Sequence, residues 1–140
     1  KMNTKVLLAA LAGAVTTFLT GWLIYGIALK GFFEAQMVES AKGVMRTEPG
    51  MLYIFLGGLS WSLLLALLYS RWAGITTLKS GAIAGAWISF LIALGANLFS
   101  YASMDAFQFP SVVVDALVNA VQGALAGGVI GAVLGYQAKQ

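Results

Sequence analysis

The sequence predicts an all-α, polytopic membrane protein with four transmembrane helices in a compact bundle. Of its 140 residues, 60% are hydrophobic and 9% are charged, whereas about a quarter of a soluble domain is charged. Four apolar stretches alternate with the charged segments, and each has at least the roughly 20 residues that cross a bilayer. Four spans leave no room for a separate soluble domain, so we expect residues 1–140 to form one transmembrane unit.

The first predicted span covers residues 6–29 and contains no Lys, Arg or Glu. A cleaved signal peptide is the alternative, because Ala12-Gly13-Ala14 resembles a small-residue cleavage site. The apolar core of a signal peptide is only about 7–15 residues long. The longer run here favours a retained helix.

The connection after this span has a helical pattern of its own. Apolar side chains recur at helical spacing between residues 31 and 46, with polar side chains on the opposite face. This predicts a short amphipathic helix on the outer membrane surface, which in its functional form is a lid over an outward-facing pocket. The alternative is a partly ordered loop with a few side chains dipping into the membrane.

The other predicted spans cover residues 51–70, 80–103 and 111–136. Pro49 and Pro110 precede the second and the fourth of them, where a helix start tolerates a missing N–H group. The two halves of the chain share short sequence matches: residues 12–14 match 84–86, and Gly57-Gly58 matches Gly127-Gly128. Two explanations stay open: two duplicated hairpins, or chance matches in Ala/Gly/Leu-rich sequence.

The basic residues predict the orientation. With four spans, both termini and the middle connection share one side of the membrane. That side carries five Lys or Arg residues and no acidic residue, against three basic and four acidic residues on the other side: Lys1, Lys5, Arg71, Lys79 and Lys139 against Lys30, Lys42, Arg46, Glu34, Glu39, Glu48 and Asp105. We therefore expect both termini to lie in the cytoplasm.

Glycines mark a packing face on the fourth span. They recur at every fourth position and have small counterparts on the third span: Gly123, Gly127, Gly131, Gly135, Gly81 and Gly85. Close backbone approach through small residues is a main source of helix association in lipid. We expect this face to pack either within the bundle, which Gly81 and Gly85 favour, or against a second copy of the chain.

The fourth span also carries the one charged side chain inside a span, Asp115. Asn119 lies about 40° to one side of it and Gln122 about 20° to the other, so all three point in one direction. Asp115 is only about 6–8 Å from the outer end of the span. A carboxylate at this depth is expected to bind a ligand or an ion, or to relay protons. The structural alternative is that it lies among the lipid headgroups and only orients the helix. Interhelical hydrogen bonding is the alternative role for the two amides.

Other polar and aromatic groups fall at a similar depth, because every span contributes some to its outer half. The expected ligand-binding set therefore joins Asp115, Asn119 and Gln122 with Asn97, Tyr25, Trp22 and Trp61. The aromatic residues also suit the ordinary interfacial belt of membrane proteins.

Composition excludes much chemistry. The sequence has no His and no Cys, which removes the usual zinc, haem and iron–sulfur ligands and nucleophilic triads. We therefore expect no catalytic residues, no metal and no cofactor, and no enzyme activity. The scattered basic residues do not form a nucleic-acid patch.

Three features together resemble a family of small four-span bacterial inner-membrane proteins catalogued as a domain of unknown function. They are Gly21-Trp22-x-x-Tyr25-Gly26 at the end of the first span, Asp115-Ala116-Leu117, and the glycine-rich run to Tyr136. The resemblance implies a four-span inner-membrane protein and supplies no catalytic residues.

Two functions follow as hypotheses. In the first, the chain binds or moves a small amphiphilic or apolar ligand, for which a lipid is one candidate, through an outward-facing pocket lined by Asp115 and the amides. In the second, it is a non-catalytic structural subunit of a larger membrane complex. Membrane lipids, a second copy of the chain or a larger complex are the expected partners.

Overall fold

The computed structural model describes residues 4–46 and 48–138 of the chain. Lys1 and Lys139, which entered the charge count, lie outside these residues. The described elements are helices, in the order α1 (Thr4–Leu23), π-helical turn η1 (Ile24–Ala28), α2 (Lys30–Gln36), 3-10 turn η2 (Glu39–Ala41), α3 (Met51–Leu67), π-helical turn η3 (Leu68–Ala73), α4 (Leu78–Ser103) and α5 (Phe109–Ala138).

Within the described residues, four helices are long and apolar enough to cross a membrane. They are Thr4–Ala28, Met51–Ala73, Leu78–Ser103 and Phe109–Tyr136. Each begins and ends within three residues of the predicted span, so the sequence prediction of a four-helix membrane bundle is confirmed. Hydropathy locates such helices well because lipid leaves backbone N–H and C=O groups no partners except those within the helix.

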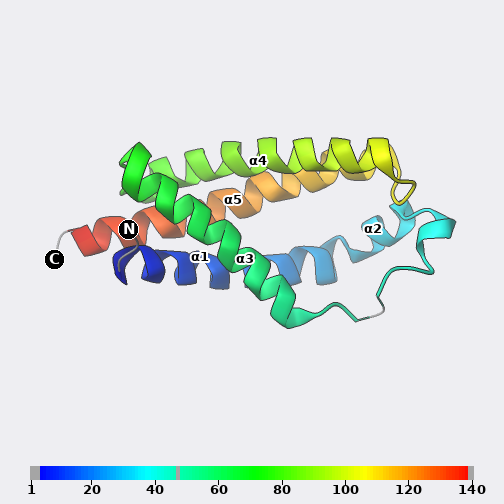
Figure 1. Cartoon of the computed structure of the whole chain (residues 1–140), viewed down its shortest axis with the longest axis horizontal. Helices are drawn as coiled ribbons and strands as arrows, with labels where there is room; N and C mark the ends of the chain where they lie inside the picture. The colour runs from blue at the N-terminus through cyan, green and yellow to red at the C-terminus, as the bar shows by residue number, and fades with distance from the viewer. Residues whose placement is uncertain (1–3, 47, 139–140) are drawn as a thin grey trace.

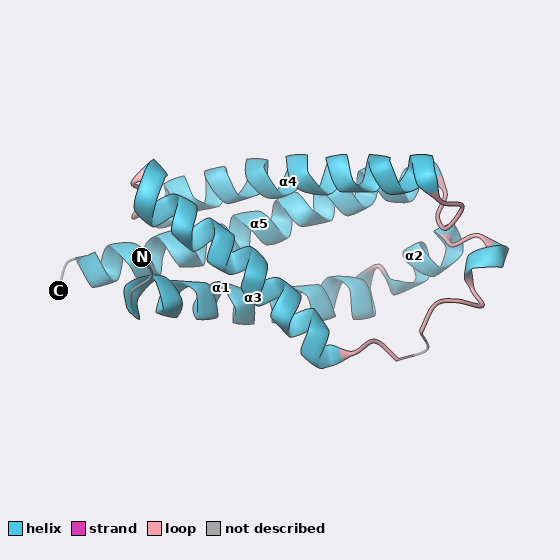
Figure 2. Ribbon diagram, in the orientation of Figure 1, coloured by secondary structure: helices cyan, strands magenta, loops and turns pink. Residues whose placement is uncertain are grey.

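The helices form an elongated bundle with two distinct ends (Figures 1 and 2). At one end α1 begins, α5 ends and α3 connects to α4; we call this the termini end. At the other end lie α2, the rest of the first connection and the turn between α4 and α5; we call this the α2 end. Helix α5 contacts α4, α1 and α3, and α3 crosses the bundle diagonally (Figure 1).

Local signals define the helix ends. Thr77 caps α4 by accepting a hydrogen bond from the backbone N–H of Ser80 at 3.1 Å. Gly74 follows η3 with φ +63°, a left-handed conformation that glycine adopts without a Cβ clash. Pro110 is the second residue of α5, where a missing N–H group costs nothing.

The glycine face of α5 packs within the chain, against α4. A Cβ atom added at Gly85 would collide with the carbonyl oxygen of Gly123, and one added at Gly127 would collide with the carbonyl oxygen of Gly81. Gly131 packs against Thr77 and Gly81 in the same way, and Gly135 packs against Thr76. The six glycines of the predicted packing face therefore lie in one intramolecular seam.

The core lies at the termini end. Tyr69 is fully buried there and donates its hydroxyl hydrogen to the carbonyl oxygen of Gly81 at 2.7 Å. It joins a cluster from α1, α3 and α5 that includes Ala9, Leu65 and Ile130. The glycine seam and this cluster close the termini end, so open space in the bundle is left at the α2 end.

The helix in the first connection is shorter than the expected residues 31–46. Helix α2 ends at Gln36, and only Glu39–Ala41 forms another helical turn. The reason is a tertiary interaction: the backbone at Met37 turns extended and forms an antiparallel bridge with Phe107 in the turn between α4 and α5. Pairing with a distant segment overrides the helical pattern here.

Two backbone hydrogen bonds hold this pairing, which we call the loop clasp (residues 36–38 and 106–108). The N–H of Val38 donates to the carbonyl of Ala106, and the N–H of Gln108 donates to the carbonyl of Gln36, both at 2.9 Å. The clasp fixes the first connection over the ends of α4 and α5.

The two hairpins, α1 with α3 and α4 with α5, pack differently at the matched glycines. Gly127 lies in the tight seam, whereas Gly57 has no atom within 4 Å of an added Cβ. Both explanations of the sequence match, duplicated hairpins and chance, stay open.

Candidate functional site

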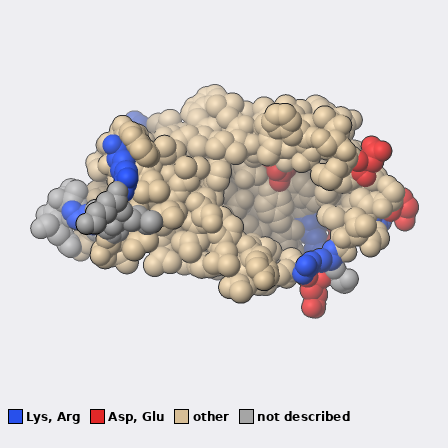
Figure 3. Space-filling model, in the orientation of Figure 1, with Lys and Arg blue, Asp and Glu red and all other residues tan. Residues whose placement is uncertain are grey.

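A cavity of about 530 Å³ opens at the α2 end of the bundle. Figure 3 shows a hollow in this part of the surface, with both acidic and basic side chains at the same end of the molecule. The wall is built by η1, α2, the first connection, α4, α5 and the turn between them. The lining residues are Tyr25, Phe33, Ala41, Val44, Met45, Asn97, Ser100, Tyr101, Met104, Ala106, Phe107, Ser111, Val112 and Asp115.

Asp115 is the centre of the polar part of this wall. Its Oδ1 accepts a hydrogen bond from the hydroxyl of Tyr25 at 2.5 Å. Its Oδ2 accepts from Nδ2 of Asn97 at 2.7 Å and from Nδ2 of Asn119 at 3.3 Å. The carboxylate thus ties together α1 through η1, α4 and α5. All three partners act as hydrogen-bond donors to the carboxyl oxygens.

The amides of the network are themselves positioned by backbone. Nδ2 of Asn97 also donates to the carbonyl of Val112 at 3.3 Å, and Nδ2 of Asn119 donates to the carbonyl of Asp115 at 2.9 Å. These bonds fix both side chains beside the carboxylate. The Asp115 network is therefore preorganised by the packing of α4 on α5.

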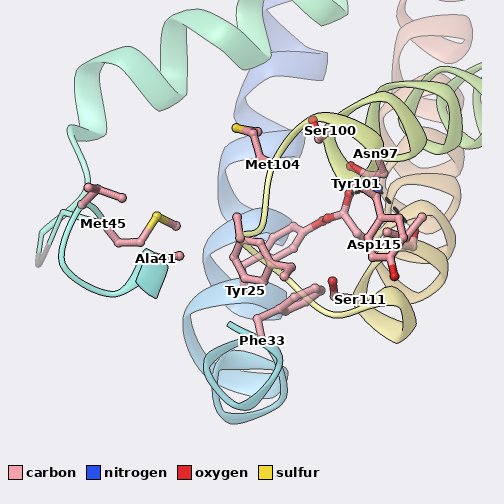
Figure 4. A pocket seen from close by; sticks show the side chains of 14 residues that line it. Tyr25, Phe33, Ala41, Met45, Asn97, Ser100, Tyr101, Met104, Ser111 and Asp115 are labelled. Carbon is pink, nitrogen blue, oxygen red and sulfur yellow. Dashed lines mark hydrogen bonds between the residues drawn. The ribbon is translucent and has the colours of Figure 1, made fainter. Parts of the chain in front are cut away.

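The apolar part of the wall faces this network. Figure 4 shows Tyr25 and Asn97 beside Asp115, with Ala41 and Met45 of the first connection across the cavity. Phe33, Ala41, Val44 and Met45 come from the segment expected to act as a lid, and the loop clasp holds that segment in place. An apolar cavity with a few convergent polar groups is the ordinary form of a small-molecule site.

The structure brings together four of the seven residues expected to bind a ligand. Tyr25, Asn97 and Asp115 line the cavity. Asn119 contacts the carboxylate from one turn deeper in α5 and does not line the cavity.

The other three expected residues lie elsewhere. Gln122 is 8% exposed and donates to the carbonyl of Thr17 at 3.1 Å and to the hydroxyl of Thr20 at 3.2 Å, so it joins α5 to α1. Trp61 donates from Nε1 to the hydroxyl of Ser89 at 3.2 Å, away from the cavity. Trp22 is 57% exposed on the outer face of α1, where lipid or the interfacial belt would surround it.

Several lining residues did not enter the expected ligand-binding set. Phe33, Met104 and Phe107 come from α2 and from the turn after α4. Helical periodicity says nothing about side chains in a turn, and the clasp that gathers them pairs segments about 70 positions apart. For the part of the wall near the end of α4, the sequence offered one indication: Ser100 and Tyr101 lie at a depth similar to that of Asp115.

The charge of the cavity is unbalanced. Asp115 is the one acidic lining residue among those described, and no Lys or Arg stands beside it in the wall. Within residues 4–46 and 48–138, the ion pair is between Lys42 and Glu39 on the surface. In the same part of the chain, no three His, Cys, Asp or Glu side chains gather as a metal site would require. The arrangement can hold the polar end of a molecule whose body is apolar.

Comparisons with protein-family models, with curated proteins and with solved structures return no match. The resemblance to the small four-span family therefore stays a prediction. What the described residues show is four helices long and apolar enough to cross a membrane.

Proposed function

We propose that this chain binds or moves a small amphiphilic or apolar molecule, for which a lipid is one candidate, in the cavity at the α2 end. The observation that carries the proposal is the cavity of about 530 Å³ whose mainly apolar wall contains the Asp115 carboxylate. This volume lies within the range of about 300–1,000 Å³ typical of small-molecule sites. The role is binding or transport, without a catalysed reaction.

The position of Asp115 supports a ligand role over a purely structural one. A carboxylate within a membrane span is costly, and such residues usually mark a site or pathway. Gln122 offers a comparison within the same helix, because it is buried between α5 and α1 and serves as interhelical glue. Asp115 is half-buried in the cavity wall, where a ligand can reach it.

The alternative, a structural subunit of a larger membrane complex, has lost part of its support. A free glycine face could have docked a partner helix, but these glycines are occupied by α4 and by the segment before it. The exposed apolar side chains of α3 and α4 are equally suited to contact lipid.

We further propose the bacterial inner membrane as the location, with both termini in the cytoplasm. The charge count across the connections supports this orientation. The sequence has no Cys, so single-cysteine variants report sidedness directly. In intact cells with a permeabilised outer membrane, a membrane-impermeant maleimide should label Lys42→Cys but not Lys79→Cys; the reverse pattern would overturn the orientation.

A thermal-stability screen tests the binding function. The purified protein in a neutral detergent is heated with fractions of a membrane lipid extract, and unfolding is followed by tryptophan fluorescence. We expect at least one fraction to raise the Tm of the wild type, because a ligand that binds the folded state stabilises it. Asp115→Asn should reduce or abolish this rise. No rise with any fraction would contradict the proposal.

A further inference from the structure

We infer that the cavity selects an organic cation carried on an apolar body, such as an alkylammonium or arylphosphonium ion. The inference rests on the proposed binding function and names the chemical class of its ligand.

The first support is the charge of the wall. Among the described lining residues, Asp115 contributes one negative charge and no basic residue offsets it. Arg46 lines a neighbouring depression on the other side of Met45, together with Tyr53, and does not line the cavity. A ligand with one positive charge would balance the carboxylate, whereas an anionic ligand would meet like charge in a site of low dielectric.

The second support is the hydrogen bonding of the carboxylate. Its three partners, Tyr25, Asn97 and Asn119, are neutral donors that leave the negative charge in place. A carboxylate has about four acceptor positions. Oδ2 receives two of these bonds and Oδ1 receives one, so Oδ1 keeps a position for a ligand N–H group.

The third support is the aromatic content of the same wall. Tyr25, Phe33, Tyr101 and Phe107 all line the cavity, and the rings of Tyr25 and Phe33 lie 5.2 Å apart between centroids. Aromatic faces attract organic cations, including those without N–H groups. The wall thus offers a carboxylate and π-systems to the charge, and methionine and aliphatic side chains to the apolar body.

Two sources could supply this chemistry: a free hydrophobic cation, or the ammonium group of a phospholipid. A zwitterionic phospholipid would also bring a phosphate, for which the described wall has no basic partner. We therefore expect a free cation to bind more tightly than a phosphatidylethanolamine headgroup.

The test uses two ions of the same shape and opposite charge. Binding of tetraphenylphosphonium and of tetraphenylborate to the full chain in a neutral maltoside detergent is measured by equilibrium dialysis, with protein-free micelles subtracted. We expect saturable binding of the phosphonium ion and at least about tenfold weaker binding of the borate. In nanodiscs of phosphatidylcholine, adding phosphatidylethanolamine should not displace the phosphonium ion; displacement would assign the site to the lipid headgroup and overturn the preference for a free cation.

Two variants separate charge from folding. Asp115→Asn should weaken phosphonium binding at least about tenfold, because the variant loses the Coulomb attraction between the carboxylate and the cation. Val44→Lys places a positive charge on a lining residue that is 82% exposed and outside the Asp115 network. It should weaken phosphonium binding about two- to fivefold relative to Val44→Gln.

The outcomes distinguish this inference from the function on which it rests. If the borate binds as well as the phosphonium ion, or both variants bind the cation as the wild type does, the cation preference is wrong. Stabilisation by a lipid fraction would then still support an amphiphile site. If neither ion binds and no lipid fraction raises the Tm, the binding function fails as well.

Discussion

The hydroxyl of Tyr25 donates a hydrogen bond to Oδ1 of Asp115 and so joins the π-helical turn at the end of the first span to the last span. The two residues are 90 positions apart in the chain, and both line the cavity at the α2 end. This contact makes the carboxylate part of a rigid wall and fixes the direction in which its oxygens point.

Tyr25→Phe removes this donor and keeps the ring. We expect the unfolding free energy to fall by about 1 kcal/mol. This value lies between the average contribution of an interhelical hydrogen bond in a membrane and that of a hydrogen bond to a charged group. Thermal unfolding in detergent measures it. Tyr53→Phe is the matched control, because Tyr53 is 75% exposed; equal effects of the two variants would show that the contact contributes nothing.

Gln122→Leu separates structural amides from the ligand site. The variant keeps the side-chain size and loses two hydrogen bonds to α1, so we expect a lower Tm, by about 1 kcal/mol in stability. Binding of the stabilising lipid fraction should change less than about twofold, in contrast to Asp115→Asn. A loss of binding as large as that of Asp115→Asn would place Gln122 in the ligand site after all.

The glycine seam predicts a sharp contrast within α4. Gly85→Ala drives a methyl group into the backbone of α5, whereas Gly95→Ala points into open space. We expect Gly85→Ala to cost about 2 kcal/mol, as overpacking usually does. Gly95→Ala should be neutral or stabilising by up to about 1 kcal/mol, because alanine favours a helix over glycine. Similar Tm values for the two variants would argue against the seam.

The loop clasp can be loosened by one substitution. Val38 has φ −74° and Met37 is extended, so Val38→Pro fits the backbone and removes only the N–H that bonds to Ala106. We expect faster hydrogen exchange at the amide of Gln108, measured by mass spectrometry on peptides, and faster ligand release. Val38→Ala, which keeps the N–H, should leave exchange unchanged; unchanged exchange in the proline variant would contradict the clasp.

The sequence allowed the spans, the glycine seam and the placement of Asp115 within a span to be predicted, because each depends on local pattern. Hydropathy defines a span, and a four-residue glycine period defines a face. The helix face on which a residue lies was not enough to place Gln122 relative to the cavity. It shares a face with Asp115, yet two turns deeper the neighbouring surface is α1 rather than the cavity.

The remaining differences between the expected and the observed structure come from contacts between distant segments. The expected helix over residues 31–46 has the right period, and it ends early because Met37 pairs with Phe107. Likewise, Trp22 and Trp61 are of a residue type that often lines ligand sites. Whether their side chains face the cavity depends on how α1 and α3 are rotated relative to α5. Periodicity in one segment does not report that rotation.

Protection of a cysteine in the cavity shows directly whether a ligand occupies the cavity. Met104→Cys introduces a single thiol into the wall, at a residue that is more than half exposed, and Lys42→Cys is the control outside the cavity. The rate of alkylation by a small maleimide is measured with and without the lipid fraction that raises the Tm. We expect the ligand to slow alkylation at residue 104 at least about fivefold, because a ligand in the cavity blocks access to this thiol. The rate at residue 42 should not change. Equal rates at residue 104 with and without the ligand would contradict the proposed binding.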